Sequence, residues 1–164
     1  DRLPVENTAL RGSSLNLVNV CSAQPKFDSD AFKTGKSANG DWLARVPAEV
    51  GYNLSTLRQG KEKYDIHCSV CHGDYGNGAG VTAKFGLNPR NLSDPSNSGT
   101  YLESAAPWTD GQLYNAISNG SASGIMLGLK DRLSPKERWS IVLYLRALQD
   151  YVGKATQSKK GQGS

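Results

Sequence analysis

The sequence predicts an all-α domain that is preceded by an irregular N-terminal extension. Two observations lead to this fold class: helix-capping signals precede three segments of apolar periodicity, and no strand pattern precedes the cysteine-containing motif in mid-chain. At 164 residues the chain has the size of one domain with an added segment. We expect the extension over residues 1–52, the domain over residues 53–153 and a flexible basic tail over residues 154–164.

The extension shows neither sustained helical nor sustained strand periodicity, and prolines and glycines interrupt it. It contains the aromatic residues Phe27, Phe32 and Trp42, whereas pure linkers are poor in aromatic side chains. We therefore expect an ordered but irregular segment that docks against another surface.

Each of the three predicted helices has a start signal. Asn53 is a favourable N-cap for the first helix, and Gly60 inside that helix indicates the close approach of a second helix. Residues 109–112 form a capping-box pattern for the second helix, which residues 119–120 end. Residues 134–137 form another capping box, with proline at the first helical position of the long third helix.

The first helix runs into the motif C-x-x-C-H, formed by Cys68, Cys71 and His72. Two thiols three positions apart lie about one helical turn from each other, so both can form thioethers with one porphyrin. His72 then offers an imidazole nitrogen to the iron. The motif predicts one covalently attached haem c. Because bacteria attach this haem outside the cytoplasm, it also predicts the periplasm or the outer face of the cytoplasmic membrane.

Other readings of the motif fit less well. A structural zinc site needs four ligands, and outside the motif only Cys21 and His67 remain. A thioredoxin-like motif needs a βαβ context, which no strand pattern supports. A disulfide between the motif cysteines leaves His72 without a role. Cys21 is then left over, and we expect a free thiol on or near the surface.

Met126 is the only methionine and the predicted second axial ligand of the iron. It lies in a glycine-containing loop between the second and third helices rather than on a helical face. A thioether sulfur favours Fe(II) and so raises the reduction potential. His67 is the rival ligand, but its place beside the first motif cysteine keeps it on the wrong side of the ring.

Residues 88–92 follow the motif as an extended turn with two further candidate site residues. A ligating histidine usually gives its other N–H to a carbonyl, and the backbone oxygen of Pro89 is the candidate acceptor for His72. Arg90 is a candidate partner for a haem propionate, with a solvated arginine as the alternative. Residues 81–85 before this turn predict a short piece of helix.

Charge and hydropathy exclude some classes of function. The formal net charge is +4, but residues 53–153 hold ten Lys and Arg against nine Asp and Glu. Without a basic helix face or an aromatic platform, nucleic-acid binding has no support. No stretch approaches the roughly 20 apolar residues of a membrane span. No signal peptide is visible, so we expect a mature or trimmed form.

From residue 53 to residue 152 the order of features resembles class I cytochromes c. A helix runs into C-x-x-C-H and is followed by a proline loop, a middle helix, a methionine loop and a C-terminal helix. The resemblance implies three main helices around one covalent haem, and an electron-transfer protein that is not an enzyme by itself. In place of the family's usual Met-Pro, this chain has Met126-Leu127.

Residues 4–12, 32–36, 58–66 and 138–149 resemble the mono-haem cytochrome c subunit of alternative complex III, whereas residues 13–24 do not fit that pattern. This resemblance implies a periplasmic, membrane-associated subunit of a quinol-oxidising respiratory complex, often lipid-anchored, with redox proteins as partners. A free soluble electron carrier remains an alternative. A haem sensor or peroxidase with an open sixth coordination position is another, but it lacks a well-placed distal histidine or arginine.

Overall fold

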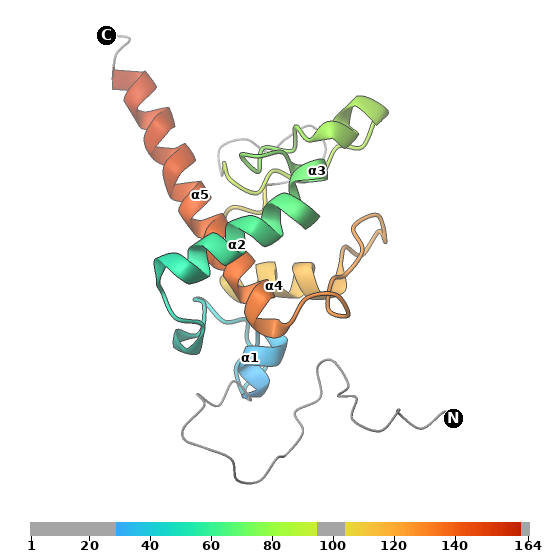
Figure 1. Cartoon of the computed structure of the whole chain (residues 1–164), viewed down its shortest axis with the longest axis vertical. Helices are drawn as coiled ribbons and strands as arrows, with labels where there is room; N and C mark the ends of the chain where they lie inside the picture. The colour runs from blue at the N-terminus through green and yellow to red at the C-terminus, as the bar shows by residue number, and fades with distance from the viewer. Residues whose placement is uncertain (1–28, 95–103, 162–164) are drawn as a thin grey trace.

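Five α-helices and two short 3-10 helices make up the part of the chain that the structure describes (Figure 1). The structure, a computed structural model, describes residues 29–94 and 104–161, with side chains up to residue 155. In chain order the elements are α1 (Asp30–Thr34), η1 (Ala48–Val50), α2 (Leu54–His67), α3 (Ser69–His72), η2 (Val81–Phe85), α4 (Asp110–Asn119) and α5 (Pro135–Gly161). The described residues contain only isolated β-bridges and no longer strand, so the predicted all-α class is confirmed.

The three main helices begin where their capping residues predict. The Asn53 side chain accepts a backbone N–H of the first turn of α2 at 2.9 Å. Thr109 and Gln112 form a complete capping box at the start of α4. At the start of α5, Ser134 N–H donates to Glu137 Oε2 at 2.9 Å. These bonds satisfy N–H groups that lack partners within the helix, so local sequence is sufficient to start each helix.

Helices α2 and α5 cross at Gly60 (Figure 1). A Cβ atom added to Gly60 would lie 2.0 Å from the carbonyl oxygen of Ser140, so only glycine allows this approach. One turn further along α2, the fully buried Tyr64 packs against Tyr144 with ring centroids 5.3 Å apart. The close approach that the glycine predicted is therefore confirmed.

Helix α4 also packs against α5 and completes the core. The rings of Tyr114 and Trp139 stack with centroids 4.2 Å apart and an interplanar angle of 18°. Apolar side chains from α2, α4, α5 and the loop before α5 fill the space between the helices; they include Tyr64, Leu113, Tyr114, Ile117, Leu133, Trp139, Ile141, Val142 and Leu145. The long C-terminal helix therefore contacts both other main helices.

Residues 29–52 share this core. The Trp139 indole N–H donates to the carbonyl of Phe32 at 2.7 Å, and Val46 N–H donates to Asp110 Oδ2 at 2.6 Å. The buried apolar residues of the segment are Phe32, Val46 and Val50. The predicted boundary before residue 53 thus separates two segments that pack together. The rest of the predicted extension, including Cys21, lies outside the described residues.

Helix α5 continues to Gly161, where the sequence predicted a flexible tail from residue 154. Gly153 costs a helix only about 1 kcal/mol relative to alanine, and the residues after it include good helix formers. A single glycine is therefore not enough to end this helix. In the part of the chain that the structure describes, no helix has the length and apolar character needed to cross a membrane.

Candidate haem site

Cys68 is the residue at which α2 ends and α3 begins. Its carbonyl accepts the N–H of Cys71 at 3.1 Å and the N–H of His72 at 2.8 Å, so the motif forms one helical turn. This turn gives the two thiols the spacing that thioether bonds to one porphyrin require. Cys68 is buried, Cys71 is half-buried, and both thiols are free. The alternative of a disulfide between them is therefore not formed in this structure.

The thiol of Cys68 is in an apolar environment. Burial raises the pKa of Cys68 to about 12, and the neighbouring Cys71 adds to the rise. Among the described residues no group of three or more His, Cys, Asp or Glu could hold a metal ion. The zinc alternative has no support in this part of the chain.

His72 closes the motif as a buried, neutral imidazole. Burial lowers the pKa of His72 below its ordinary value, although the hydrogen bond to the carbonyl of Arg90 opposes this shift. The His72 Nδ1 atom lies 3.0 Å from that carbonyl oxygen. A carbonyl can only accept, so Nδ1 carries the proton and donates it. Nε2 is left with a free lone pair, which is the form in which histidine ligates iron.

The acceptor for His72 is therefore the carbonyl of Arg90, and the prediction of the Pro89 carbonyl is wrong by one residue. The physical reason is how the turn packs against the loop after the motif. A Cβ atom added to Gly78 would lie 2.8 Å from the carbonyl oxygen of Pro89, so that oxygen faces Gly78. The next carbonyl along the turn is the one that faces the imidazole.

The glycine-rich loop after His72 folds back onto α3. Gly78 N–H donates to the carbonyl of His72 at 2.9 Å, and Gly80 N–H donates to the carbonyl of Cys71 at 3.1 Å. The Tyr64 hydroxyl donates to the carbonyl of Gly73 at 2.6 Å. A Cβ atom at Gly80 would lie 2.3 Å from the Cys71 carbonyl oxygen. The loop thus satisfies the carbonyls at the end of α3 and holds the motif in place.

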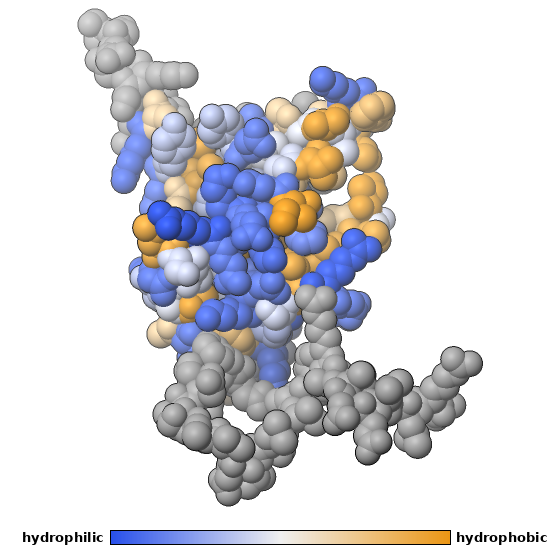
Figure 2. Space-filling view, in the orientation of Figure 1, coloured by the Kyte–Doolittle hydropathy of each residue, from blue (hydrophilic) through white to orange (hydrophobic). Residues whose placement is uncertain are grey.

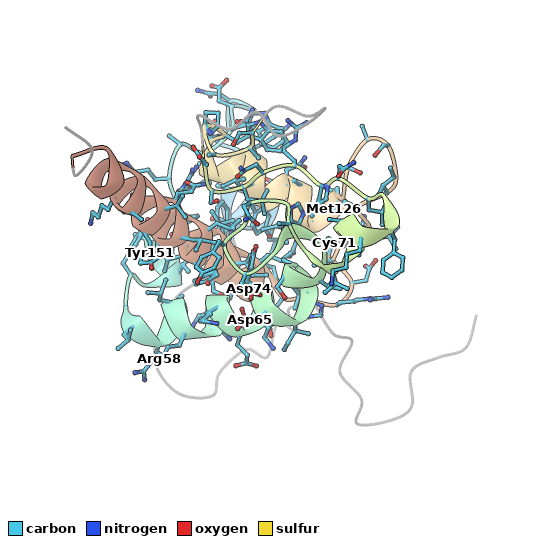
Figure 3. The ribbon with its side chains drawn as sticks, turned by 90° about the horizontal axis from the view of Figure 1, so that it is seen from above. Arg58, Asp65, Cys71, Asp74, Met126 and Tyr151 are labelled. Carbon is cyan, nitrogen blue, oxygen red and sulfur yellow. The ribbon has the colours of Figure 1, made fainter. Side chains whose placement is uncertain are left out.

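Met126 lies in the loop between α4 and α5. Figures 1 and 3 show this loop on the side of the molecule that carries α3, and the labelled Met126 and Cys71 lie at the same end of the view in Figure 3. Arg58 and Tyr151 lie at the opposite end of that view. Met126 is half-buried, and its sulfur belongs to a segment separate from the C-x-x-C-H turn. Met126 and the C-x-x-C-H motif therefore lie at the same end of the molecule, and the role of Met126 as a ligand stays a prediction.

Arg90 and its neighbour Asn91 form the segment that holds the His72 acceptor in place. The guanidinium of Arg90 lies 5.0 Å from the ring centroid of Trp108, a cation–π contact that the sequence did not indicate. Pairing of Arg90 with a propionate stays a prediction. Asn91 is 2% exposed, and its Oδ1 atom accepts the N–H of Ser93 at 2.9 Å. Sequence analysis did not single out Asn91, although asparagine in a turn is a signal for this bond.

A set of exposed apolar side chains surrounds the candidate ligands. They come from the end of α2, from α3, from η2 and its following residues, and from the Met126 loop: Ile66, Val70, Val81, Phe85, Leu87, Ile125 and Leu127. Figure 2 shows apolar side chains gathered along the flank where Figure 1 draws these segments. Such a set of exposed apolar residues marks a binding surface. Two thiols, a neutral imidazole, a thioether and an apolar frame together fit a covalently attached haem.

Comparisons with known proteins identify the family of this chain. The cytochrome c family model matches residues 57–149, which include the C-x-x-C-H turn and Met126. Among solved structures, the c-type cytochrome KustC0563 is 27% identical with a TM-score of 0.43, over 55% of this chain and 96% of that chain. A chain of the Kuenenia stuttgartiensis reducing HAO-like protein complex is 24% identical with a TM-score of 0.47, over 60% of this chain and 48% of that chain. No curated protein matches.

Proposed function

This chain belongs to the cytochrome c family, and on that basis we propose that it carries single electrons on one haem c with two axial protein ligands. Cys68 and Cys71 would hold the porphyrin, and His72 and Met126 would hold the iron. The haem, when bound, supplies a reversible Fe(III)/Fe(II) couple. The observation that carries the proposal is the His72 imidazole, whose Nδ1 donates to a carbonyl at 3.0 Å and whose Nε2 is left to ligate.

The two proposed axial ligands are both uncharged, and this property suits an electron carrier. A neutral imidazole and a thioether leave the ligand charge unchanged when one electron is gained or lost. The thioether of Met126 favours the reduced state and so raises the reduction potential. A filled sixth position also leaves no site for peroxide or a diatomic gas, which separates a carrier from a haem enzyme or sensor.

The test of the ligand set is carbon monoxide binding by the dithionite-reduced protein. We expect the absorption spectrum of the wild type to change only at carbon monoxide concentrations far above those that saturate a variant without the Met126 sulfur. Met126→Ala and Met126→Leu should both bind carbon monoxide, because each removes the sulfur and the leucine variant nearly keeps the side-chain volume. A wild type that binds carbon monoxide as tightly as these variants would mean an open sixth position. The sensor or peroxidase alternative would then replace the carrier.

We further propose that the protein works in the periplasm as a subunit of a quinol-oxidising respiratory complex such as alternative complex III. Covalent haem attachment through C-x-x-C-H supports the compartment. The resemblance of residues 58–66 and 138–149 to that subunit supports the complex. Much of the second segment is core, but the first includes the exposed residues Arg58, Lys61 and Asp65 on α2, which are accessible to a partner. A lipid anchor or the partner subunits would provide the membrane association.

The complex is tested by fractionating cells that express the tagged chain. After osmotic shock we expect the cytochrome in the membrane fraction. Detergent should extract it as part of a complex, and the haem iron in this complex should become reduced when quinol is added. Recovery of the whole pool in the soluble periplasmic fraction, with no reduction by quinol, would instead identify a free carrier. Recovery in the cytoplasm without covalent haem would contradict both forms of the proposal.

A further inference from the structure

The loop that carries Met126 has no buried residue to anchor it. Every residue from 120 to 129 is exposed or half-buried. Ile125 and Leu127, on either side of Met126, are each 73% exposed. At the far end of the loop the half-buried Leu129 packs against the hydrophobic core, whereas Ile125 and Leu127 are among the exposed apolar side chains of the candidate haem site. Near Met126 itself, hydrogen bonds within the loop hold the backbone of this residue.

Ser121 makes these hydrogen bonds with both backbone groups of Met126. The Ser121 N–H donates to the carbonyl of Met126 at 2.9 Å, and the Ser121 Oγ atom accepts the N–H of Met126 at 3.1 Å. The carbonyl of Ser121 accepts the N–H of Gly124 at 3.0 Å, and its Oγ lies 3.0 Å from Ser123 Oγ. One residue thus closes the loop from 121 to 126 onto itself.

The end of α4 holds Ser121 and the far end of the loop together. Leu129 N–H donates to the carbonyl of Ile117 at 2.9 Å, and Lys130 N–H donates to the carbonyl of Ser118 at 3.2 Å. Gly120 has a φ of +83°, and a Cβ atom there would lie 2.2 Å from the Met126 carbonyl oxygen. Both ends of the loop are therefore fixed to one helix, and Ser121 connects that frame to Met126.

We infer that the Ser121 hydroxyl is a positioning residue that holds Met126 where its thioether reaches the haem iron, and so keeps the sixth coordination position closed. This inference rests on the proposed function, since it requires Met126 as a ligand. Ser121→Ala keeps the N–H that bonds the Met126 carbonyl but removes the acceptor for the Met126 N–H. The fraction of molecules with Met126 off the iron should then rise.

The expected effect follows from the open fraction, which is the fraction of molecules in which Met126 is off the iron. A ligand that competes with Met126 binds with an apparent Kd equal to its intrinsic Kd divided by the open fraction. The net contribution of one hydrogen bond corresponds to roughly a two- to tenfold change in such an equilibrium. We therefore expect Ser121→Ala to lower the apparent Kd for carbon monoxide by roughly two- to tenfold. Ser121→Thr keeps the hydroxyl and should restore the wild-type value.

The experiment measures carbon monoxide Kd for the reduced wild type, the two Ser121 variants, Met126→Ala and the double variant Ser121→Ala/Met126→Ala. Hydrogen exchange of the Met126 amide is a second measurement, and this amide should exchange faster in Ser121→Ala. The matched control is Ser134→Ala, because Ser134 Oγ is another exposed acceptor of a backbone N–H, at 3.3 Å from the nitrogen of Glu137. The control should change stability without changing carbon monoxide binding.

Three results would overturn the positioning role. In the first, Ser121→Ala matches the wild type in both carbon monoxide Kd and Met126 amide exchange. In the second, Ser134→Ala lowers Kd as much as Ser121→Ala does. In the third, Ser121→Ala lowers Kd even when Met126 is already alanine, which would mean that the two residues act independently. Equal Kd for wild type and Met126→Ala is a different result, because it would remove Met126 from the iron and contradict the proposed ligand set.

Discussion

At the scale of single residues, two helical glycines have opposite roles. Gly60 in α2 lies against the backbone of α5, where an added Cβ would be 2.0 Å from the Ser140 carbonyl oxygen. At Gly153 in α5, no atom outside the neighbouring turns of its own helix lies within 4 Å of the position that a Cβ would occupy. Glycine in a helix normally costs about 1 kcal/mol relative to alanine. Only at Gly60 does packing offset this cost.

We therefore predict opposite signs for the same substitution at the two positions. Gly60→Ala should lower the free energy of unfolding by roughly 1–3 kcal/mol, because the methyl group meets a backbone carbonyl that cannot rotate away. Gly153→Ala should raise it by roughly 0.5–1 kcal/mol through helix propensity alone. Urea unfolding followed by circular dichroism measures both. A neutral or stabilising Gly60→Ala would show that the two helices do not cross at this position.

At the scale of elements, one carboxylate joins three segments. Asp110 lies at the start of α4 and is 6% exposed. Its Oδ1 atom accepts from Arg146 Nε of α5 at 2.6 Å, and its Oδ2 atom accepts the N–H of Val46 at 2.6 Å. Arg146 also donates to the carbonyl of Ala106 at 3.0 Å. Removing this carboxylate would leave donors of two other segments without their acceptor.

Asp110→Asn tests this junction with almost no change in shape. The amide NH₂ group cannot accept, so it faces either the Arg146 or the Val46 donor without a bond. We expect a loss of roughly 2–3 kcal/mol in the free energy of unfolding, the range for a hydrogen bond to a charged group. Asp150→Asn, the same change at an exposed position of α5, should stay within about 0.5 kcal/mol of the wild type. Equal effects of the two substitutions would contradict the junction.

At the scale of the whole molecule, the segment before α2 belongs to the core of the domain. Phe32 is 2% exposed, and its carbonyl accepts the indole N–H of Trp139. The Tyr114 hydroxyl donates to the carbonyl of Lys33 at 3.1 Å. These contacts lie on helices α4 and α5, which are also the helices on either side of the Met126 loop. The segment therefore supports the frame in which that loop sits.

Phe32→Ala should destabilise the whole domain rather than release a separate arm. The loss of a fully buried phenylalanine costs about 3–5 kcal/mol. We expect one cooperative unfolding transition at lower urea concentration. Tyr151→Ala, which removes an aromatic ring that is 61% exposed, should change the midpoint little. An unchanged midpoint for Phe32→Ala would mean that residues 29–52 are an appendage and not part of the core.

The candidate site was partly predictable because covalent haem attachment is encoded in five consecutive residues. The sequence fixes the spacing of Cys68, Cys71 and His72. One helical turn at the end of α2 holds all three residues together. The acceptor of the His72 N–H was predicted one residue too early, at Pro89 instead of Arg90. Which carbonyl of an extended turn faces a ring depends on packing against another loop, and sequence spacing carries no information on that packing.

Local signals were sufficient wherever a structure depends on neighbours within about four residues. The starts of α2, α4 and α5 follow from caps whose bonds close within the first turn, and the haem motif closes within α3. Contacts between distant segments, such as those of residues 29–52 with α4 and α5, required the tertiary structure. The loop that presents Met126 lies between these cases, since its bonds are local. Its role depends on which side of the molecule the ends of α4 and α5 place it.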